Sequence, residues 1–263
     1  MTADNKPTLV IVGGAFHTSA SYGKLASALR GSGFEVHVPR LPTCNEARPP
    51  NADLTDDTNL IRSYVESLVE AGRTVVPVGH SYGGQVMFNA LYGLGLEARS
   101  SQGLKGGIST LIYMVGYALP EGTSTFDKFM EFGKLENVPL VFDMAEDHTI
   151  VLRDAPLTMG LRGPGIDEAE IEAYVKTLCR WHGKGMMQPI QKAAWREIPV
   201  AYIHTTTDLS IPTPEQQNMV EGVDKALEST GRRVQTFTVE SGHCPNFSAT
   251  QGVVDAINKA VLG

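Results

Sequence analysis

The chain has few cysteines, no long apolar run and no cluster of basic residues, and each absence narrows its possible functions. Its three cysteines, Cys44, Cys179 and Cys244, have no paired spacing, which is typical of reduced thiols in an intracellular protein. The N-terminus is polar and contains no apolar signal-peptide core. No apolar run approaches the about 18 residues that a transmembrane helix requires. We therefore expect a cytoplasmic protein that does not cross a membrane.

The charge balance of the chain is acidic. Lysine and arginine number 22 against 29 aspartates and glutamates, which gives a formal net charge of −7. Nucleic acids and anionic membrane surfaces call for basic patches, so neither is an expected partner. Cys179 and His182 form an isolated pair rather than a zinc-type cluster, so we expect no metal site. A small-molecule substrate is the expected partner, and the sequence leaves a homodimer open.

Strand-like and helix-like segments alternate along most of the 263 residues. Alternation of this kind predicts one α/β domain, in which helices cover both faces of a mostly parallel sheet. The rhythm breaks between about residues 120 and 198, where we expect a cap inserted after the sixth sheet strand, with a helical patch at Asp167 to Trp181. The expected strands are 8–12, 34–38, 74–80, 107–117, 199–204 and 234–239, and the expected helices are 22–30, 53–71, 85–89 and 251–261.

The most informative segment is 74–84, an apolar run that ends in Gly79-His80-Ser81-Tyr82-Gly83. This G-x-S-x-G pattern between a strand and a helix is typical of a nucleophile elbow, which exposes a serine at the top of a sheet. A side chain at Gly79 or Gly83 would collide with the neighbouring element. Pro77 cannot donate a hydrogen bond to a sheet, so we expect the strand to leave regular pairing there.

A serine nucleophile needs a histidine base, and the base needs an orienting carboxylate. His243 is the predicted base, because its loop follows the last strand and precedes the last helix. Asp208 is the predicted acid, because it is the first carboxylate after strand 199–204, at the sheet edge where catalytic loops gather. Asp127 and Glu121 remain alternatives for the acid.

An oxyanion hole takes the N–H after the nucleophile and a second N–H from an earlier loop. These are predicted to be the backbone N–H groups of Tyr82 and Ala15. A nucleotide cofactor is not expected, because the glycines near Ala15 lack the G-x-G-x-x-G spacing and no P-loop lysine follows. The segment 120–198 is rich in apolar and methionine side chains, which suit an adaptable pocket. The predicted pocket residues are Phe16, His17, Phe126, Phe132, Met144, Trp181 and Met186.

Together these motifs resemble the α/β-hydrolase superfamily, and most closely its small cap-bearing group of esterases and hydroxynitrile lyases. The resemblance extends over nearly the whole chain and rests on the segments 12–17, 79–84, 198–203 with Asp208, 216–219 and 241–246. It implies a serine hydrolase without a cofactor that cleaves a small to medium apolar or aromatic ester or lactone.

Two departures from that group weaken the lyase interpretation. The resemblance implies that a plant-type lyase has a lysine directly after the catalytic histidine, and this chain has Cys244 there. It implies that the other lyase type has an asparagine in the oxyanion loop, and this chain has Gly14-Ala15 there. Two alternatives to the hydrolase remain open. One is a lyase, dehydratase or cyclase of secondary metabolism on the same fold, and the other is a slow-turnover ligand sensor.

Overall fold

The computed structural model describes residues 6–163 and 165–262 and is built on one parallel sheet. Its strand order is β10-β9-β5-β3-β1-β2, and the short β4 also pairs with β3. Every pairing within this sheet is parallel. The strands are β1 Thr8–Val12, β2 Glu35–His37, β3 Thr74–His80, β4 Gly107–Ile108, β5 Leu111–Met114, β9 Val200–Thr205 and β10 Gln235–Val239.

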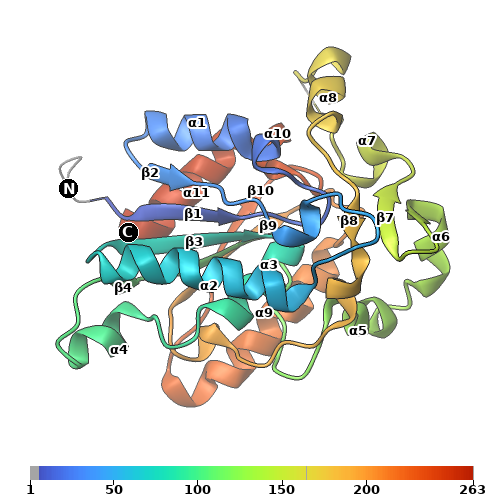
Figure 1. Cartoon of the computed structure of the whole chain (residues 1–263). Coiled ribbons are helices and arrows are strands. Elements are labelled where there is room, and N and C mark those ends of the chain that lie inside the picture. The colour runs from blue at the N-terminus through green and yellow to red at the C-terminus, as the bar shows by residue number, and fades with distance from the viewer. Residues whose placement is uncertain (1–5, 164, 263) are drawn as a thin grey trace.

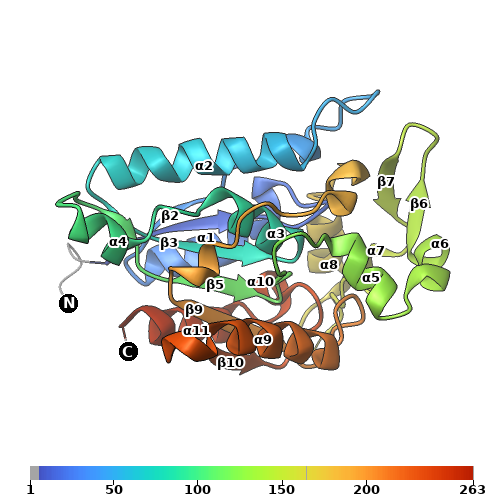
Figure 2. The same cartoon turned by 90° about the horizontal axis from the view of Figure 1, so that it is seen from below.

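Helices cover both faces of this sheet because its strands are apolar on both sides. In β1, Leu9 and Ile11 join one buried cluster with α1 and α11, whereas Val10 and Val12 join the other with α2, α3 and α9. Figures 1 and 2 show α1 and α2 on opposite sides of the sheet. The helices are α1 Gly23–Gly31, α2 Leu54–Glu70, α3 Tyr82–Ala90, α4 Leu96–Ser101, α9 Thr213–Leu227, α10 Pro245–Ser248 and α11 Thr250–Leu262.

The predicted fold class is confirmed, with local corrections. The segment 107–117 contains two short strands, β4 and β5, rather than one. The strand around Pro77 does not leave regular pairing, because β3 stays in register with β1 through Gly79. On its other side β3 pairs with β4 up to Val75 and with β5 from Val78, so the proline lies at the break between those two partners. A missing N–H is tolerated at such a break.

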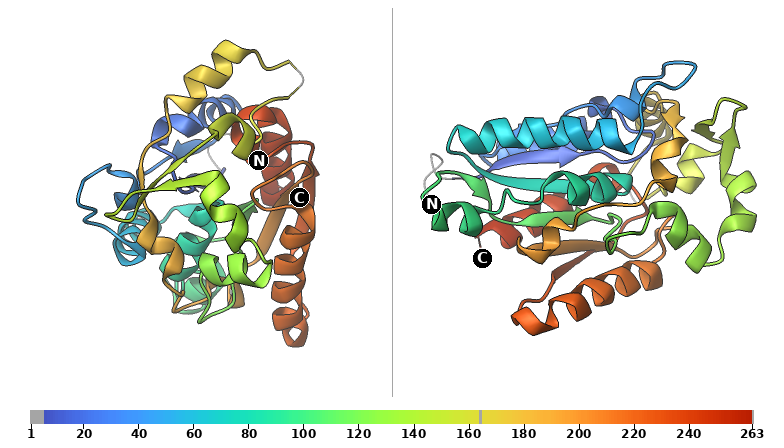
Figure 3. Two further views of the ribbon diagram at one scale, coloured as in Figure 1. Left: turned by 90° about the vertical axis from the view of Figure 1, so that its right-hand side faces the viewer. Right: turned by 60° about the horizontal axis from the view of Figure 1, so that its bottom comes forward.

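Most of residues 120–198, here called the insertion, lies beyond the carboxyl ends of the strands, at the end of the molecule away from both termini (Figures 1 and 3). Its last residues return beside α3 to the start of β9. The insertion follows β5, the fifth strand along the chain, so the predicted position after a sixth strand is wrong. It contains a small antiparallel sheet, which the sequence analysis did not predict. Its elements are α5 Thr125–Glu131, α6 Val138–Val141, β6 Phe142–Met144, β7 Thr149–Leu152, α7 Ala155–Thr158, α8 Glu168–Val175 and β8 Trp181–His182.

A single buried side chain of α3 fastens both ends of the insertion. Gln85 Nε2 donates to the carbonyl oxygens of Gly185 at 3.1 Å and Gln188 at 2.7 Å. Its Oε1 accepts from the N–H of Thr125 at 3.0 Å and from the Thr125 hydroxyl. The amide is fully buried, so these bonds satisfy groups that would otherwise lose their hydration without compensation. The insertion is therefore held where it leaves the sheet and where it returns.

Candidate active site

Ser81 lies on a sharp turn between β3 and α3. Its backbone has φ +50° and ψ −123°, a conformation that costs energy for a residue with a side chain. The turn is possible because α3 packs directly on the end of β1: a Cβ on Gly83 would lie 2.2 Å from the Val12 carbonyl oxygen. The N–H of Tyr117 donates to the Ser81 carbonyl at 3.0 Å. The serine is thus fixed at the carboxyl edge of the sheet.

Three side chains predicted to act together form one hydrogen-bonded chain. His243 Nε2 lies 2.9 Å from Ser81 Oγ, and His243 Nδ1 lies 2.8 Å from Asp208 Oδ2. All three residues are buried, so water competes little for these bonds. The carboxylate accepts from Nδ1–H, which leaves the Nε2 lone pair facing the serine hydroxyl. This tautomer is the one that a general base requires.

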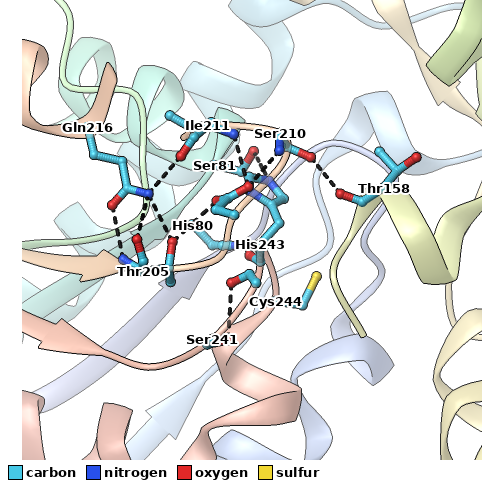
Figure 4. Close-up of polar contacts among 12 residues, drawn as sticks. His80, Ser81, Thr158, Thr205, Ser210, Ile211, Gln216, Ser241, His243 and Cys244 are labelled. Carbon is cyan, nitrogen blue, oxygen red and sulfur yellow. Dashed lines mark hydrogen bonds and ion pairs between the residues drawn. The ribbon is translucent and has the colours of Figure 1, made fainter. Parts of the chain in front are cut away.

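The loop that carries Asp208 is held by backbone and side-chain donors (Figure 4). Asp208 Oδ1 accepts from the N–H groups of Ser210 at 2.7 Å and Ile211 at 2.9 Å. Gln216 of α9 accepts from the Thr205 N–H at 3.0 Å and donates to the Ile211 carbonyl at 2.7 Å. Both carboxylate oxygens are therefore fixed, with Oδ2 directed at the histidine.

The loop 13–17 after β1 is fixed from several sides. Phe16 has φ +69°, and its carbonyl accepts from the Cys179 N–H at 2.8 Å. His17 Nδ1 donates to the Ala15 carbonyl at 2.6 Å, while Nε2 accepts from the Tyr174 hydroxyl at 3.1 Å. Burial lowers the pKa of His17 to about 4, so the ring is neutral at neutral pH. A neutral ring can donate from Nδ1 and accept at Nε2. The carbonyl groups of Ala15 and Phe16 are therefore held in place.

A buried relay beneath the serine was missed by the sequence analysis, which assigned His80 no role. The Gly14 N–H donates to the Tyr22 hydroxyl at 2.8 Å, and that hydroxyl lies 2.8 Å from His80 Nδ1. His80 Nε2 lies 2.8 Å from the His243 carbonyl. Burial lowers the pKa of His80 well below its usual value, so the ring is neutral and donates from Nε2 alone. The relay joins the loop after β1 to the histidine loop.

A second buried network, also missed, supports Tyr82. Asp57 Oδ2 accepts from the Tyr82 hydroxyl at 3.0 Å and from the Thr43 hydroxyl at 2.7 Å. Trp181 of the insertion donates its indole N–H to Thr43 Oγ1 at 3.0 Å. A signal was present in the sequence, because Asp57 falls on the same helical stripe as buried Ile61. A carboxylate on an apolar stripe indicates a buried polar partner.

We expect Asp57 to make stability depend on pH in a direction unusual for a carboxylate. Burial is the main reason why the pKa of Asp57 rises to about 6, although bonds from Thr43 and Tyr82 lower it. Between pH 4 and 6 the folded state then binds more protons than the unfolded state, so this group's contribution to stability falls as pH rises. In Asp57→Asn the contribution is absent, so the free energy of unfolding of the variant minus that of wild type should rise by about 1–3 kcal/mol from pH 4 to 7.

Urea denaturation of both proteins at several pH values measures this difference. Other groups titrate in the same range, but their contributions cancel in the subtraction. A difference that stays constant between pH 4 and 7 would show that Asp57 has an ordinary pKa in the folded protein.

A cavity of about 280 Å³ opens over Ser81 and His243, between the sheet edge and the insertion. Its volume is near the lower end of the about 300–1,000 Å³ typical of small-molecule sites. Ala15 and Tyr82 line it beside the serine. Apolar side chains of the insertion make up most of the opposite wall, namely Phe129, Val138, Leu140, Val141, Phe142, Ile150, Leu152, Leu157, Met159, Trp181 and Met186.

Three of the seven predicted pocket residues line this cavity: Phe16, Trp181 and Met186. The prediction is wrong for the other four, which are not among the described residues that line this cavity: His17, Phe126, Phe132 and Met144. His17 is buried beneath the loop after β1. Phe126 packs against the core, and Lys128 covers the ring of Phe132.

Met144 lies in a different place, a second cavity of about 530 Å³. This second cavity shares Ile150 and Met186 with the first. Composition identified the apolar character of the insertion, but periodicity cannot show which side of a short strand or loop faces inward.

Among residues 6–163 and 165–262, no three His, Cys, Asp or Glu side chains are grouped to hold a metal ion. Within the same residues no helix is both long and apolar enough to span a bilayer. Cys44, Cys179 and Cys244 are buried free thiols.

Comparison with known proteins agrees with the observed fold. The family model described as "Alpha/beta hydrolase family" matches residues 9–256. The chain belongs to this alpha/beta hydrolase family.

Curated relatives match it along almost their whole length. It is 32% identical over 257 residues to "Probable hydrolase R7" of Phoma sp. (strain ATCC 20986 / MF5453), which covers 96% of this chain and 97% of that one. It is 28% identical over 257 residues to "Alpha/beta hydrolase nvfD" of Aspergillus novofumigatus (strain IBT 16806), covering 97% and 96%. The structure of polyneuridine aldehyde esterase superposes with a TM-score of 0.71 at 20% identity, covering 97% of this chain and all of that one. At that identity the likeness supports the fold alone.

Proposed function

We propose that the protein is a serine hydrolase of carboxylic esters or lactones, in which Ser81, His243 and Asp208 form the catalytic triad. The observation that carries the proposal is the continuous hydrogen-bonded chain from Ser81 Oγ through His243 to Asp208, at 2.9 and 2.8 Å, at the floor of an apolar cavity. Family membership and the hydrolase names of the relatives support the same reaction class.

In the proposed mechanism, Ser81 Oγ attacks the ester carbonyl carbon while His243 Nε2 accepts the hydroxyl proton. The tetrahedral intermediate collapses, the C–O bond to the alcohol breaks, and His243 returns its proton to the leaving oxygen. Water, deprotonated by the same nitrogen, then attacks the acyl carbon, the bond to Ser81 Oγ breaks, and His243 returns the proton to Oγ as the acid is released. Asp208 stabilises the imidazolium that forms in both steps.

The proposed oxyanion hole consists of the backbone N–H groups of Ala15 and Tyr82. Tyr82 is the first residue of α3, and the first N–H groups of a helix have no acceptor within the helix. Ala15 lies on the loop that His17 and the Gly14–Tyr22 bond hold in place. Donors fixed before the reaction stabilise the developing negative charge without reorganisation, which is the largest contribution in many enzymes.

We further propose that the insertion acts as a cap that selects a small to medium apolar ester. The cavity wall that it supplies is mostly apolar, and the cavity volume of about 280 Å³ suits a small to medium substrate. The position after His243, a lysine in plant-type lyases, is a buried thiol here. Burial raises the pKa of this thiol, Cys244, to about 12, so it remains uncharged and offers no cation for a leaving anion. Hydrolysis therefore takes precedence over the lyase alternative.

Labelling with a fluorophosphonate tests the triad directly. Wild-type protein is expected to gain one adduct by intact-mass spectrometry, and Ser81→Ala none, because only a serine activated by its base reacts at a useful rate. Ser248, a partly buried serine bonded to Ser241, provides a control: Ser248→Ala should label like wild type. Absence of an adduct in folded wild type would instead favour a ligand sensor or a non-hydrolytic enzyme.

A further inference from the structure

Most polar side chains that line the catalytic cavity donate their hydrogen bonds to other groups of the protein. The Thr125 hydroxyl donates to Gln85, and the Ser210 hydroxyl donates to the Thr158 carbonyl at 2.8 Å. The Tyr82 hydroxyl donates to Asp57 at 3.0 Å. A substrate in this cavity therefore meets few free hydrogen-bond donors away from Ser81. Any donor that is still free should contribute strongly to substrate specificity.

Lys134 is the charged exception, because it brings a cation into the apolar lining. The Thr158 hydroxyl, on the same lining, is a neutral group that also makes no hydrogen bond among the described residues. Its Nζ donates to the Ser210 carbonyl at 2.7 Å and to Glu215 Oε2 at 2.5 Å. The Lys134 and Glu215 side chains are only 15% and 13% exposed. An ammonium group has three N–H donors, and these two bonds are the ones it makes among the described residues. One donor is left on a residue that lines the cavity, and the ring of Phe129, another lining residue, has its centroid 5.7 Å from Nζ.

Tyr117 adds a second donor on the same lining. Among the described residues, no group accepts a hydrogen bond from its hydroxyl. Burial, followed by the negative charges of Glu215 and Asp208, raises the pKa of Tyr117 well above its usual value. The hydroxyl therefore keeps its proton at neutral pH and remains a donor.

The charges around Lys134 determine which acceptor suits this end of the cavity. Glu215 already neutralises the lysine, and Asp208 places a second carboxylate on the same loop as Ser210. A substrate carboxylate would be a third anion beside a single cation, and it would also lose its hydration on entry. A neutral oxygen needs only the hydrogen bond and has a smaller desolvation cost.

We propose that Lys134 is a specificity-determining residue that donates its remaining N–H to a neutral oxygen of the substrate, a ketone or hydroxyl remote from the ester. Tyr117 is the proposed second donor to the same oxygen. The inference rests on the proposed ester hydrolysis and specifies its substrate class: an apolar ester or lactone with one additional keto or hydroxy group.

Matched pairs of esters test this inference. One series is p-nitrophenyl octanoate with its 5-, 6- and 7-oxo derivatives, and the other is octyl acetate with the corresponding oxo groups on the alkyl chain. Wild type should prefer one oxo isomer to its parent ester by about tenfold in kcat/KM, the effect of one hydrogen bond from a charged donor. In Lys134→Met this ratio should fall to within about twofold.

Lys128→Met is the matched control, because Lys128 is also an insertion lysine paired with a carboxylate, Glu131, at 2.7 Å. It is not among the lining residues, so its variant should keep the wild-type ratio. A purely structural role of Lys134 in holding the Ser210 loop would lower kcat/KM for all esters equally and leave the ratio unchanged. That outcome would overturn the inference, as would a wild type without preference for any oxo isomer in either series.

Glu215→Gln tests the charge argument and does not depend on the stability of the methionine variant. The lysine is then not neutralised, so kcat/KM for p-nitrophenyl hydrogen suberate relative to p-nitrophenyl octanoate should rise by about tenfold over wild type. A ratio that stays at the wild-type value would contradict the assigned role of the Lys134–Glu215 pair.

Calorimetric binding to Ser81→Ala separates this inference from the proposed reaction. The variant should bind one of the methyl oxo-octanoates or oxo-octyl acetates about tenfold more tightly than its parent ester, and addition of Lys134→Met should remove that difference. If wild type hydrolyses no ester, the proposed reaction fails, yet this binding ratio still decides the role of Lys134. If wild type hydrolyses both esters equally and the binding ratio is near one, the reaction stands and the inference fails.

Discussion

Replacement of Asp208 by asparagine is expected to lower kcat/KM for ester hydrolysis by about 10⁴-fold with little change in fold. Asparagine retains the size of aspartate, and its amide oxygen can still accept from the Ser210 or Ile211 N–H. However, an amide N–H facing His243 Nδ1 makes that nitrogen an acceptor and places the ring proton on Nε2. The base then presents a proton to Ser81 instead of a lone pair, and it also loses the charge that stabilises the imidazolium.

Glu121→Gln is the matched control, since Glu121 was an alternative candidate for the acid. The structure places Glu121 in an exposed ion pair with Arg196 at 2.9 Å, away from His243. Exposed pairs of this kind contribute about 0–1 kcal/mol, so turnover should stay within about twofold of wild type. Asp127, the other alternative, caps helix α5 through Ser124. Similar losses in Asp208→Asn and Glu121→Gln, measured by steady-state kinetics, would reject Asp208 as the acid.

Gly83→Ala is expected to destabilise the fold by about 4 kcal/mol or more, an effect at the upper end for single substitutions. The new methyl group would lie 2.2 Å from the Val12 carbonyl oxygen and 2.6 Å from that of Gly13. Both obstacles are backbone atoms of β1 and its loop, which no side-chain rotation can move away. The turn at Ser81 would have to shift, so labelling by a fluorophosphonate should decrease together with the thermal midpoint.

Gly222→Ala is the same glycine-to-alanine change, but it is expected to raise the stability of the fold. Gly222 lies within α9, and nothing lies within 4 Å of a Cβ at that position. Alanine lowers the entropy of the unfolded chain and favours the helix, so stability should rise by about 0.5–1 kcal/mol. Equal destabilisation by both variants in chemical denaturation would mean that the close approach of α3 to β1 is not what requires glycine at residue 83.

The sheet, its covering helices and the residues around Ser81 could be predicted because their signals are local. The strand of 74–80 is a β-branched run, and G-x-S-x-G combines a tight turn with a helix start. Chain order then selected Asp208 and His243, and the structure brings both side chains to Ser81. These predictions depend on residues within one short segment or on the order of segments in a parallel sheet.

The remainder of the site depends on contacts between segments far apart in the sequence. Lys134 meets Glu215 across 81 positions, and Trp181 meets Thr43 across 138. Strands β6, β7 and β8 have only 3, 4 and 2 residues, too few for a period-two pattern to emerge. Which face of such a short element turns toward the cavity is decided by packing, so composition alone could not separate Phe142, which lines it, from Met144, which does not.

The anchoring of the insertion by Gln85 has a consequence for how proteins of this architecture diverge. Three of the four bonds that Gln85 makes involve backbone groups, the carbonyls of Gly185 and Gln188 and the N–H of Thr125. Any sequence whose chain passes through the same three points can be held in the same way. The Gln85 anchor therefore tolerates substitutions in much of the intervening segment. Exchange of the whole segment would have to keep the insertion residues that also support the catalytic loops, such as Tyr174 and Trp181.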